Sequence, residues 1–302
     1  MNNRHKSGFV TLIGRPNVGK STLMNSIIGQ KIAITSNKPQ TTRNMIQGIY
    51  NEEDTQIVFV DTPGIHKPNH KLGKYLNKQA YYSIDDVDVI LFLVDASSSL
   101  GGGDKYILEK LKDANKPVIL IINKIDKLTK DEILVKISEY KDLYNFSEIV
   151  PVSALKKDNV KTVVEVLRKY LPDSVRFYGE DEITNKPMHF LIAETVREKV
   201  FNLTEEEVPH SITCYVENID NKKNSVNINV VIVVDRDSLK RIIIGARGSK
   251  IKEIGTLARA DIEKLLGKKV YLELFVKVIS KWRDKDKILN EIGHKDFNDL
   301  IE

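Results

Sequence analysis

The segment 14–21, Gly-Arg-Pro-Asn-Val-Gly-Lys-Ser, constrains this 302-residue chain more than any other stretch. Its spacing is G-x-x-x-x-G-K-S, in which glycines let the backbone wrap closely around a phosphate while N–H groups face the anion. An apolar run at 9–13 precedes it and a helical pattern at 21–29 follows it, as the motif requires. We therefore predict a phosphate-binding loop (P-loop) in which Lys20 reaches the β- and γ-phosphates and Ser21 binds Mg²⁺. The nucleotide-binding residues expected here are Asn17, Val18, Gly19, Lys20, Ser21 and Thr22.

The first half of the chain repeats one pattern, in which apolar runs of strand length alternate with helical stretches, the last of them at 160–170. Continuous apolar strands separated by helices indicate a mostly parallel sheet covered by helices on both faces, an α/β fold. The segment 45–51 precedes one strand by a short polar turn, so we expect an antiparallel edge hairpin. The predicted buried strands are 9–13, 56–60, 89–94, 118–122 and 149–152.

The sequence D-T-P-G at 61–64 comes directly after a predicted strand. We expect the Asp61 carboxylate to hold Mg²⁺, usually through water, and the Gly64 N–H to contact the γ-phosphate. A threonine hydroxyl in the loop before the edge strand would complete the metal shell, with Thr42 preferred and Thr41 as the alternative. The metal ligands expected are Ser21, Thr42 and Asp61, and the nucleotide contacts at this strand end are Asp61, Thr62 and Gly64.

The sequence N-K-I-D at 123–126 follows another predicted strand and is expected to determine which nucleotide base is bound. The Asp126 carboxylate can accept hydrogen bonds from N1–H and the 2-amino group of guanine, which adenine lacks. We expect the Asn123 amide to contact N7 and tie to the P-loop, and the Lys124 stem to pack on the base. The alternative, an ordinary turn at the start of a helix, would account for a single Asn or Asp but not for the whole tetrapeptide. The tripeptide Ser153-Ala154-Leu155 follows the last strand, and its central N–H is expected to read guanine O6.

The second half of the chain changes character and has the order helix, strand, strand, helix, helix, strand. A sequence G-A-R-G joins the two consecutive helices, with basic residues on either side. Such a G-x-x-G turn permits close backbone approach to a nucleic acid, and a tight turn between core helices is the alternative. We expect the apolar positions 242–244 and 251 to line a groove for bases. The predicted elements are 188–202, 212–216, 226–234, 237–244, 249–266 and 270–279, and the predicted RNA-binding residues are Lys240, Arg241, Gly245, Ala246, Arg247, Gly248, Lys250 and Lys252.

Positive charge is concentrated in the second half of the chain. The segment 236–283 holds thirteen Lys or Arg and five Asp or Glu, a net of +8, whereas the whole chain carries +5. This distribution favours a polyanionic partner over an evenly solvated surface. The single cysteine excludes an intrachain disulfide and fits a reducing compartment, and no signal peptide or membrane-spanning run is visible. We expect a cytoplasmic protein.

The ordered set of motifs resembles the translation-factor-like class of P-loop GTPases. In signalling GTPases the position of Ile65 carries a glutamine that orients water, so the resemblance implies slow intrinsic hydrolysis that relies on backbone groups, metal or a partner. In related GTPases the asparagine at the position of Asn17 accompanies a K⁺ ion beside the phosphates. A simple polar loop residue is the alternative. The catalytic residues expected are Lys20, Thr42, Gly64 and Asn17.

The whole chain resembles the Era family of bacterial GTPases, on the segments P-Q-T-T-R at 39–43, D-T-P-G-I-H-K-P at 61–68 and G-A-R-G at 245–248. The resemblance implies a GTPase domain at 1–174, a linker at 175–186 and a type II KH RNA-binding domain at 187–302. It also implies binding to the 3′ end of 16S ribosomal RNA, a role in maturing the small (30S) ribosomal subunit, and peripheral contact with the inner face of the membrane, by a monomer.

Two alternatives stay open. In the first, the basic second domain docks on acidic lipid or a protein; in the second, the GTPase acts on another RNA, such as a large-subunit precursor.

Overall fold

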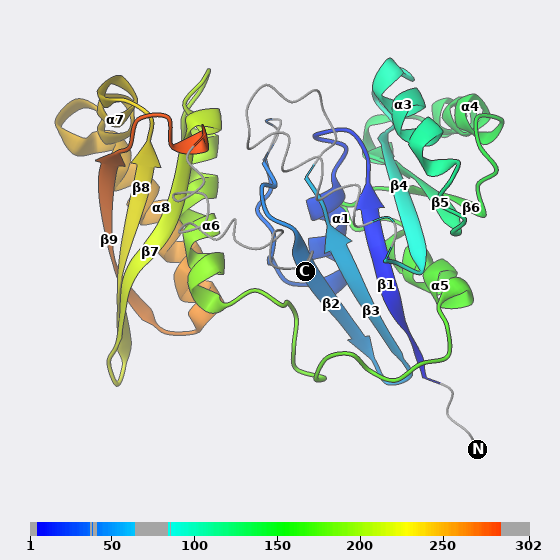
Figure 1. Cartoon of the computed structure of the whole chain (residues 1–302), viewed down its shortest axis with the longest axis horizontal. Helices are drawn as coiled ribbons and strands as arrows, with labels where there is room; N and C mark the ends of the chain where they lie inside the picture. Colours follow the sequence, from blue (N-terminus) through cyan, green and yellow to red (C-terminus); the bar gives the residue numbers. More distant parts are fainter. Residues whose placement is uncertain (1–4, 37, 39–40, 64–83, 85, 285–302) are drawn as a thin grey trace. The chain divides into compact units, whose positions relative to one another are not determined.

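The computed structural model describes residues 5–36, 38, 41–63, 84 and 86–284 (Figure 1). The described residues form two compact units, which meet in sequence between Asn185 and Lys186. The first unit contains a six-stranded sheet and the second a three-stranded sheet. Among the described residues, no helix is both long enough and apolar enough to cross a membrane.

The sheet of the first unit has the order β2-β3-β1-β4-β5-β6. Only β2 runs antiparallel to its neighbour, which confirms the predicted edge hairpin and the mostly parallel sheet. Every residue of β3 is buried, as expected for a strand whose two faces are both covered. The strands are β1 (Lys6–Ile13), β2 (Ile46–Glu52), β3 (Thr55–Asp61), β4 (Val89–Asp95), β5 (Val118–Asn123) and β6 (Glu148–Val152).

Helices cover both faces of this sheet (Figure 1). Ile107, Leu111 and Tyr140, from two helices on one face, share a buried cluster with strand residues such as Phe92 and Leu120. The helices are α1 (Lys20–Ile28), α3 (Gly102–Leu111), α4 (Lys130–Lys141) and α5 (Val160–Tyr170), with a 3₁₀ turn η1 (Ile125–Lys127). Helices α1 and α5 contact each other. The motif segments all lie at the carboxyl ends of the parallel strands, where open α/β sheets place their ligands.

The segment 176–185, here called the strap, leads to the second unit and is bound along the β2–β3 hairpin. The Gln56 side chain accepts hydrogen bonds from the N–H groups of Phe177 (2.7 Å) and Tyr178 (3.0 Å) and donates to the Tyr178 carbonyl (2.9 Å). The N–H of Ile49 donates to the carbonyl of Ile183 at 2.9 Å. The strap therefore covers part of the edge that β2 would otherwise expose.

We expect Gln56→Leu to loosen the strap. Gln56 is fully buried, and leucine leaves the two strap N–H groups without their acceptor. The loss is expected to lower the free energy of unfolding by about 2 kcal/mol and to expose the strap to protease. Urea unfolding and limited proteolysis check this. Tyr178→Phe, which removes only a hydroxyl that donates to Gln47 Oε1 (2.5 Å), is the control. Equal cleavage of Gln56→Leu and the parent would contradict the expectation.

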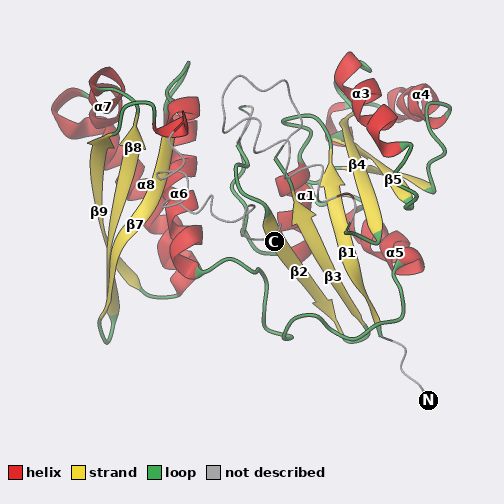
Figure 2. Cartoon of the chain, viewed as in Figure 1, coloured by secondary structure: helices red, strands yellow, loops and turns green. Residues whose placement is uncertain are grey.

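The second unit has the predicted element order, and its sheet has the order β7-β8-β9, with β7 antiparallel and β9 parallel to β8 (Figure 2). Buried residues of α6 and α8, such as Val196 and Ile254, share one cluster with those of the strands, such as Ile228 and Val230. The elements are α6 (Met188–Leu203), β7 (Ile212–Asn221), β8 (Ser225–Val234), α7 (Asp237–Ile244), α8 (Ser249–Leu266) and β9 (Lys269–Val278), with 3₁₀ turns η2 (Pro209–Ser211), η3 (Ala246–Gly248) and η4 (Trp282–Asp284).

Two expectations for the second unit were wrong in detail. Strand β7 continues to Asn221 rather than stopping at Val216, because it pairs with β8 across a shift of register between Val216 and Asn218. The isoleucines of α7 do not all face a groove: Ile243 is fully buried in the core, whereas Ile242 is 47% exposed. Consecutive residues of a helix point about 100° apart, so neighbours cannot share one face.

Candidate functional site

The P-loop lies between β1 and α1, and residues of β4 and of the end of β5 lie against it. A Cβ at Gly14 would lie 2.5 Å from the Leu93 carbonyl of β4, so only glycine fits there. Gly19 has φ +100°, and a Cβ there would clash with the Asn123 side chain. Asn123 Nδ2, at the end of β5, donates to the Val18 carbonyl at 2.8 Å. The expected tie between Asn123 and the P-loop is present, and it explains why Gly19 has no side chain.

Lys20 lies inside the loop that it belongs to. Its side chain is buried, and Nζ donates to the carbonyls of Gly14 and Arg15, both at 3.1 Å. Burial lowers the pKa of Lys20 to about 8, against an opposing effect of the Asp61 carboxylate. An anion placed in the loop would favour the charged form of Lys20, since opposite charges stabilise each other where water is excluded.

Ser21, Thr42 and Asp61 come from three separate segments and converge on one point. Ser21 Oγ donates to Asp61 Oδ2 at 2.5 Å and lies 3.0 Å from Thr42 Oγ1, which is 3.4 Å from the same carboxylate oxygen. Asp61 Oδ1 is buried and has no hydrogen-bond partner among the described residues. Burial raises the pKa of Asp61, against the hydrogen bond from Ser21 and the charge of Lys20. This set of hard oxygen atoms with an unmatched buried carboxylate oxygen suits Mg²⁺.

The choice between the two threonines follows from where their hydroxyls point. Thr41 Oγ1 donates to the Lys38 carbonyl at 2.7 Å, whereas Thr42 Oγ1 lies beside Ser21 and Asp61. The geometry favours Thr42 as the metal ligand.

The N-K-I-D segment follows β5 and is braced by neighbouring strand ends. Ser153 Oγ donates to Asp126 Oδ1 at 2.5 Å, which fixes the carboxylate expected to bind the base. Lys124 Nζ donates to the Asn17 carbonyl and to Asp95 Oδ2, both at 2.7 Å. Burial alone would raise the pKa of Asp95, but hydrogen bonds from Lys124 and Ser97 outweigh it, and the pKa is lowered. Lys124 thus joins the base-binding segment to the P-loop.

Sequence reasoning missed Asp95, although its place at the carboxyl end of β4 could have identified it.

The Ala154 N–H has a partner within the described protein, and its contact with guanine O6 stays a prediction. This N–H donates to Asn123 Oδ1 at 3.0 Å. The reason is that Asn123 is turned with its Nδ2 toward the P-loop, which leaves its oxygen facing the loop after β6. The next residue, Leu155, is 73% exposed, and its contact with the nucleotide stays a prediction.

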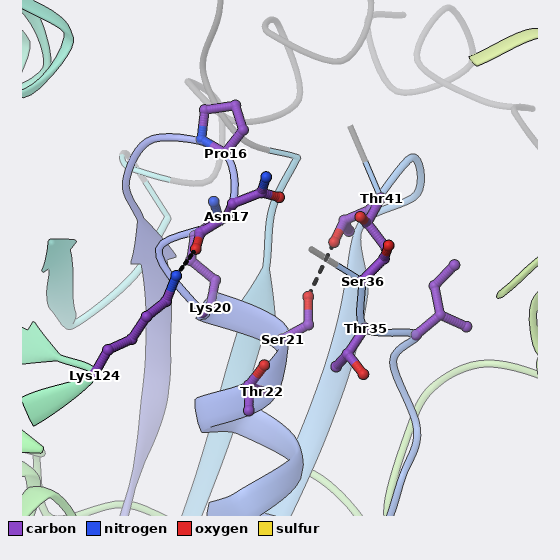
Figure 3. Close-up of a pocket in the computed structure, with 12 residues that line it drawn as sticks. Pro16, Asn17, Lys20, Ser21, Thr22, Thr35, Ser36, Thr41 and Lys124 are labelled. Atoms are coloured by element: carbon purple, nitrogen blue, oxygen red, sulfur yellow. Dashed lines mark hydrogen bonds between the residues drawn. The ribbon is translucent and has the colours of Figure 1, made fainter. Parts of the chain in front are cut away.

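A pocket opens between the P-loop and the segment that carries Thr35, Ser36 and Thr41, with Lys124 at one end (Figure 3). Asn17 has φ +65°, and its side chain extends over the pocket toward Ser36 and Thr41. The K⁺ ion expected beside Asn17 stays a prediction. Several expected sites and motif positions fall outside the described residues: Gly64, Ile65, His66, Lys67, Pro68, Pro39 and Gln40.

The G-x-x-G turn of the second unit lies between α7 and α8. Gly245 has φ +73°, and a Cβ there would lie 2.7 Å from the Cβ of Lys250. Gly248 has φ +78° and nothing within 4 Å of its Cβ position. The intervening Ala246 and Arg247 are exposed. The turn therefore presents its backbone outward, as a clamp for a phosphate backbone requires.

The basic residues around this turn divide into two groups. Arg241, Arg247 and Lys252 are exposed, and Lys240 is half-buried. Lys250 Nζ instead donates at 3.2 Å to the carbonyl of Leu203, the last residue of α6. A lysine at the carboxyl end of a helix offsets the helix dipole, so part of the role of Lys250 is structural.

Comparisons with known proteins agree with both sites. A family model described as "50S ribosome-binding GTPase" matches residues 9–124, and a KH domain model matches residues 207–283. A solved structure of Era with MgGDPNP and nucleotides 1506–1542 of 16S ribosomal RNA is 43% identical, with 96% of this chain and 99% of that chain covered and a TM-score of 0.93. A variant of Aquifex aeolicus Era bound to GDP and AlF4⁻ has the same identity and coverage and a TM-score of 0.92.

Proposed function

This chain belongs to the Era family of GTPases, and from that premise we propose that it binds and hydrolyses GTP with Mg²⁺ and binds the 3′ end of 16S ribosomal RNA through its second unit. The convergence of Ser21, Thr42 and Asp61 beside the P-loop supports the nucleotide part, because three distant segments meet at one carboxylate whose other oxygen is buried without a partner among the described residues. The exposed G-x-x-G turn supports the RNA part.

Some of the site residues bind the nucleotide, and others hold the metal ion that offsets the charge of the phosphates. The P-loop N–H groups and Lys20 hold the β- and γ-phosphates, and Asp126 holds the base. Ser21, Thr42 and Asp61 hold Mg²⁺, which when bound neutralises charge that develops on the phosphates. No glutamine follows the D-T-P-G segment, so this chain lacks the side chain that orients water in signalling GTPases. Turnover is therefore slow until a partner or backbone group supplies that role.

RNA binding rests on backbone approach and charge. The G-x-x-G turn clamps the backbone of about four nucleotides, with Arg247 beside the phosphates. Residues 236–283 carry a net charge of +8. Neutralising phosphates releases counterions, so affinity should fall steeply as salt rises.

The strap provides a covalent route between the two functions. It is bound to β2 and β3, which follow Thr42 in sequence and end at Asp61, and α6 begins at Met188, shortly after the strap ends. We propose that GTP and Mg²⁺ order the segments around Thr42 and Asp61 and thereby make the RNA-binding face available. Such coupling is reciprocal, so RNA should favour the GTP state.

Gly248→Asp is expected to weaken RNA binding at least tenfold and leave nucleotide affinity unchanged. The added carboxylate would stand in the turn and repel phosphate, and the open space at this position lets the side chain fit. Gly248→Asn is the matched control, because asparagine tolerates a positive φ and carries no charge. Filter binding of RNA and a fluorescent-GDP titration measure the two affinities. Equal loss of both affinities would indicate a folding defect instead.

The first test of the function is a titration against the single-stranded 3′ tail of 16S RNA, with a GTP analogue and with GDP, at two salt concentrations. Tight, salt-sensitive binding with the GTP analogue alone supports the proposal. Equal binding in both states keeps the RNA-binding unit and removes the coupling. Absence of binding in both states overturns the RNA proposal in favour of a lipid or protein partner.

We extend the proposal to a role in small-subunit maturation and to peripheral contact with the inner face of the membrane. Both rest on family membership and on the basic second unit. Co-sedimentation with 30S precursors and with anionic vesicles tests them separately. The description of the matching GTPase model as 50S ribosome-binding favours a second candidate, action on large-subunit RNA. Competition between 16S and 23S fragments decides between the two.

A further inference from the structure

We propose that Asp104 is a positioning residue for the nucleotide site, acting on the P-loop through Arg15. This inference rests on the proposed binding of a guanine nucleotide. Neither residue is among the expected nucleotide contacts, although Arg15 stands within the P-loop motif; both lie in the first unit, Asp104 near the start of α3.

The Asp104 carboxylate joins three parts of the unit. The side chain has no exposed surface, and Oδ1 forms an ion pair with Arg15 Nε at 2.9 Å. Oδ2 accepts hydrogen bonds from the N–H of Gly101 at 3.1 Å and from the Tyr140 hydroxyl of α4 at 3.3 Å. A buried carboxylate is costly unless it is paired, so this arrangement fixes Arg15 as well as α3.

The glycine run before Asp104 makes room for the Arg15 side chain. A Cβ at Gly103 would lie 2.9 Å from Arg15 Cδ, and one at Gly101 would lie 3.1 Å from Arg15 Nη1. A Cβ at Gly102 would meet nothing within 4 Å. Gly101 and Gly103 thus leave the space in which the Arg15 side chain lies, which explains two of the three consecutive glycines at the start of a helix, where glycine weakens the helix itself.

Arg15 in turn supports Lys20. The Arg15 carbonyl accepts a hydrogen bond from Lys20 Nζ at 3.1 Å, so the position of the Arg15 backbone sets where that ammonium lies. The line of contacts runs from Asp104 to the Arg15 side chain, along its backbone, and to Lys20. Breaking the ion pair releases the Arg15 side chain from Asp104 and lets the backbone that supports Lys20 relax, which should weaken binding of phosphates and leave binding of the base unchanged.

The test compares ligands that differ only in phosphates. Asp104→Asn keeps an acceptor for the Gly101 N–H, so α3 can still begin at its place. We expect it to weaken GDP and GTP-analogue binding about tenfold and to leave the weak competition by guanosine unchanged. The double variant Arg15→Gln/Asp104→Asn should lose no more than Asp104→Asn alone, because both changes break the same pair. It also avoids the unpaired buried carboxylate that Arg15→Gln alone would leave.

A matched pair of alanine variants tests whether Gly103 makes room for Arg15. Gly103→Ala should displace Arg15 and weaken GDP binding, whereas Gly102→Ala, at the neighbouring helical position, should not. Unchanged GDP affinity in Asp104→Asn would overturn the proposal, as would equal losses for GDP and guanosine or additive losses in the double variant. If the parent protein itself does not bind GDP, the proposed function fails and not this inference alone.

Discussion

Asp126→Asn is expected to change the nucleotide preference of this protein from guanosine triphosphate to xanthosine triphosphate. Ser153 Oγ holds Asp126 Oδ1 at 2.5 Å, so the carboxylate presents fixed acceptors to the base. An asparagine amide presents a donor in place of one acceptor, which opposes the 2-amino group of guanine and matches the 2-carbonyl of xanthine. Sites that hydrogen-bond a substrate group reject analogues lacking it by about 10⁴-fold or more, so a change in the GTP-to-XTP ratio of about 10⁴-fold is expected.

Competition against a fluorescent GDP analogue measures this ratio. Ser153→Ala is the control, because it removes the support of Asp126 while keeping the negative charge. We expect Ser153→Ala to weaken GTP binding modestly and not to strengthen XTP binding. If Asp126→Asn binds GTP as tightly as the parent does, base recognition lies elsewhere.

Asp61→Asn is expected to remove most of the dependence of GTP binding and hydrolysis on Mg²⁺, with a loss of about 10²- to 10³-fold in turnover. The Asp61 carboxylate has one buried oxygen without a partner in the described chain and lies beside Ser21 and Thr42. An amide keeps the shape but loses the charge that a divalent cation needs. Titrating Mg²⁺ in a phosphate-release assay checks the prediction.

A pair of threonine variants provides the control. Thr42→Ala should share part of the defect, whereas Thr41→Ala should not, because Thr41 Oγ1 binds the Lys38 carbonyl instead. The same dependence on Mg²⁺ in Asp61→Asn and the parent would rule out Asp61 as a ligand.

Asp61→Asn should not lower the free energy of unfolding in the absence of nucleotide. Burial raises the pKa of Asp61 above its unfolded value. A carboxyl whose folded pKa is raised contributes stability below its unfolded pKa, and that contribution is lost as pH rises through the folded pKa. Above its folded pKa the ionised group therefore opposes folding, and the neutral amide does not. A Tm at pH 7 that is equal to or above that of the parent, together with lost Mg²⁺ dependence, would identify a residue kept for function rather than for folding.

Local patterns were sufficient for much of the fold. The P-loop helix, α5, α7 and α8 lie within a residue or two of their predicted positions, because each has a helical apolar pattern and is bounded by glycine or a break. The mostly parallel pairing of the strands in the first half follows from apolar runs that must be covered on both faces, whereas the order of the strands was not predicted. Motif spacing also predicted the three oxygen ligands on separate segments, and the fold brings their side chains together; that they bind a metal stays a prediction.

The sequence alone determined that this chain has a P-loop unit with guanine-type motifs and a G-x-x-G unit, since each motif is a short run whose chemistry can be read locally. Only the tertiary structure decided that Asp104 pairs with Arg15, that Gln56 holds the strap and that Lys250 is directed to Leu203. Those contacts join residues 47 to 122 positions apart, and no local pattern encodes them. They exist because folding buries polar groups that must find partners, and the partners depend on which elements meet.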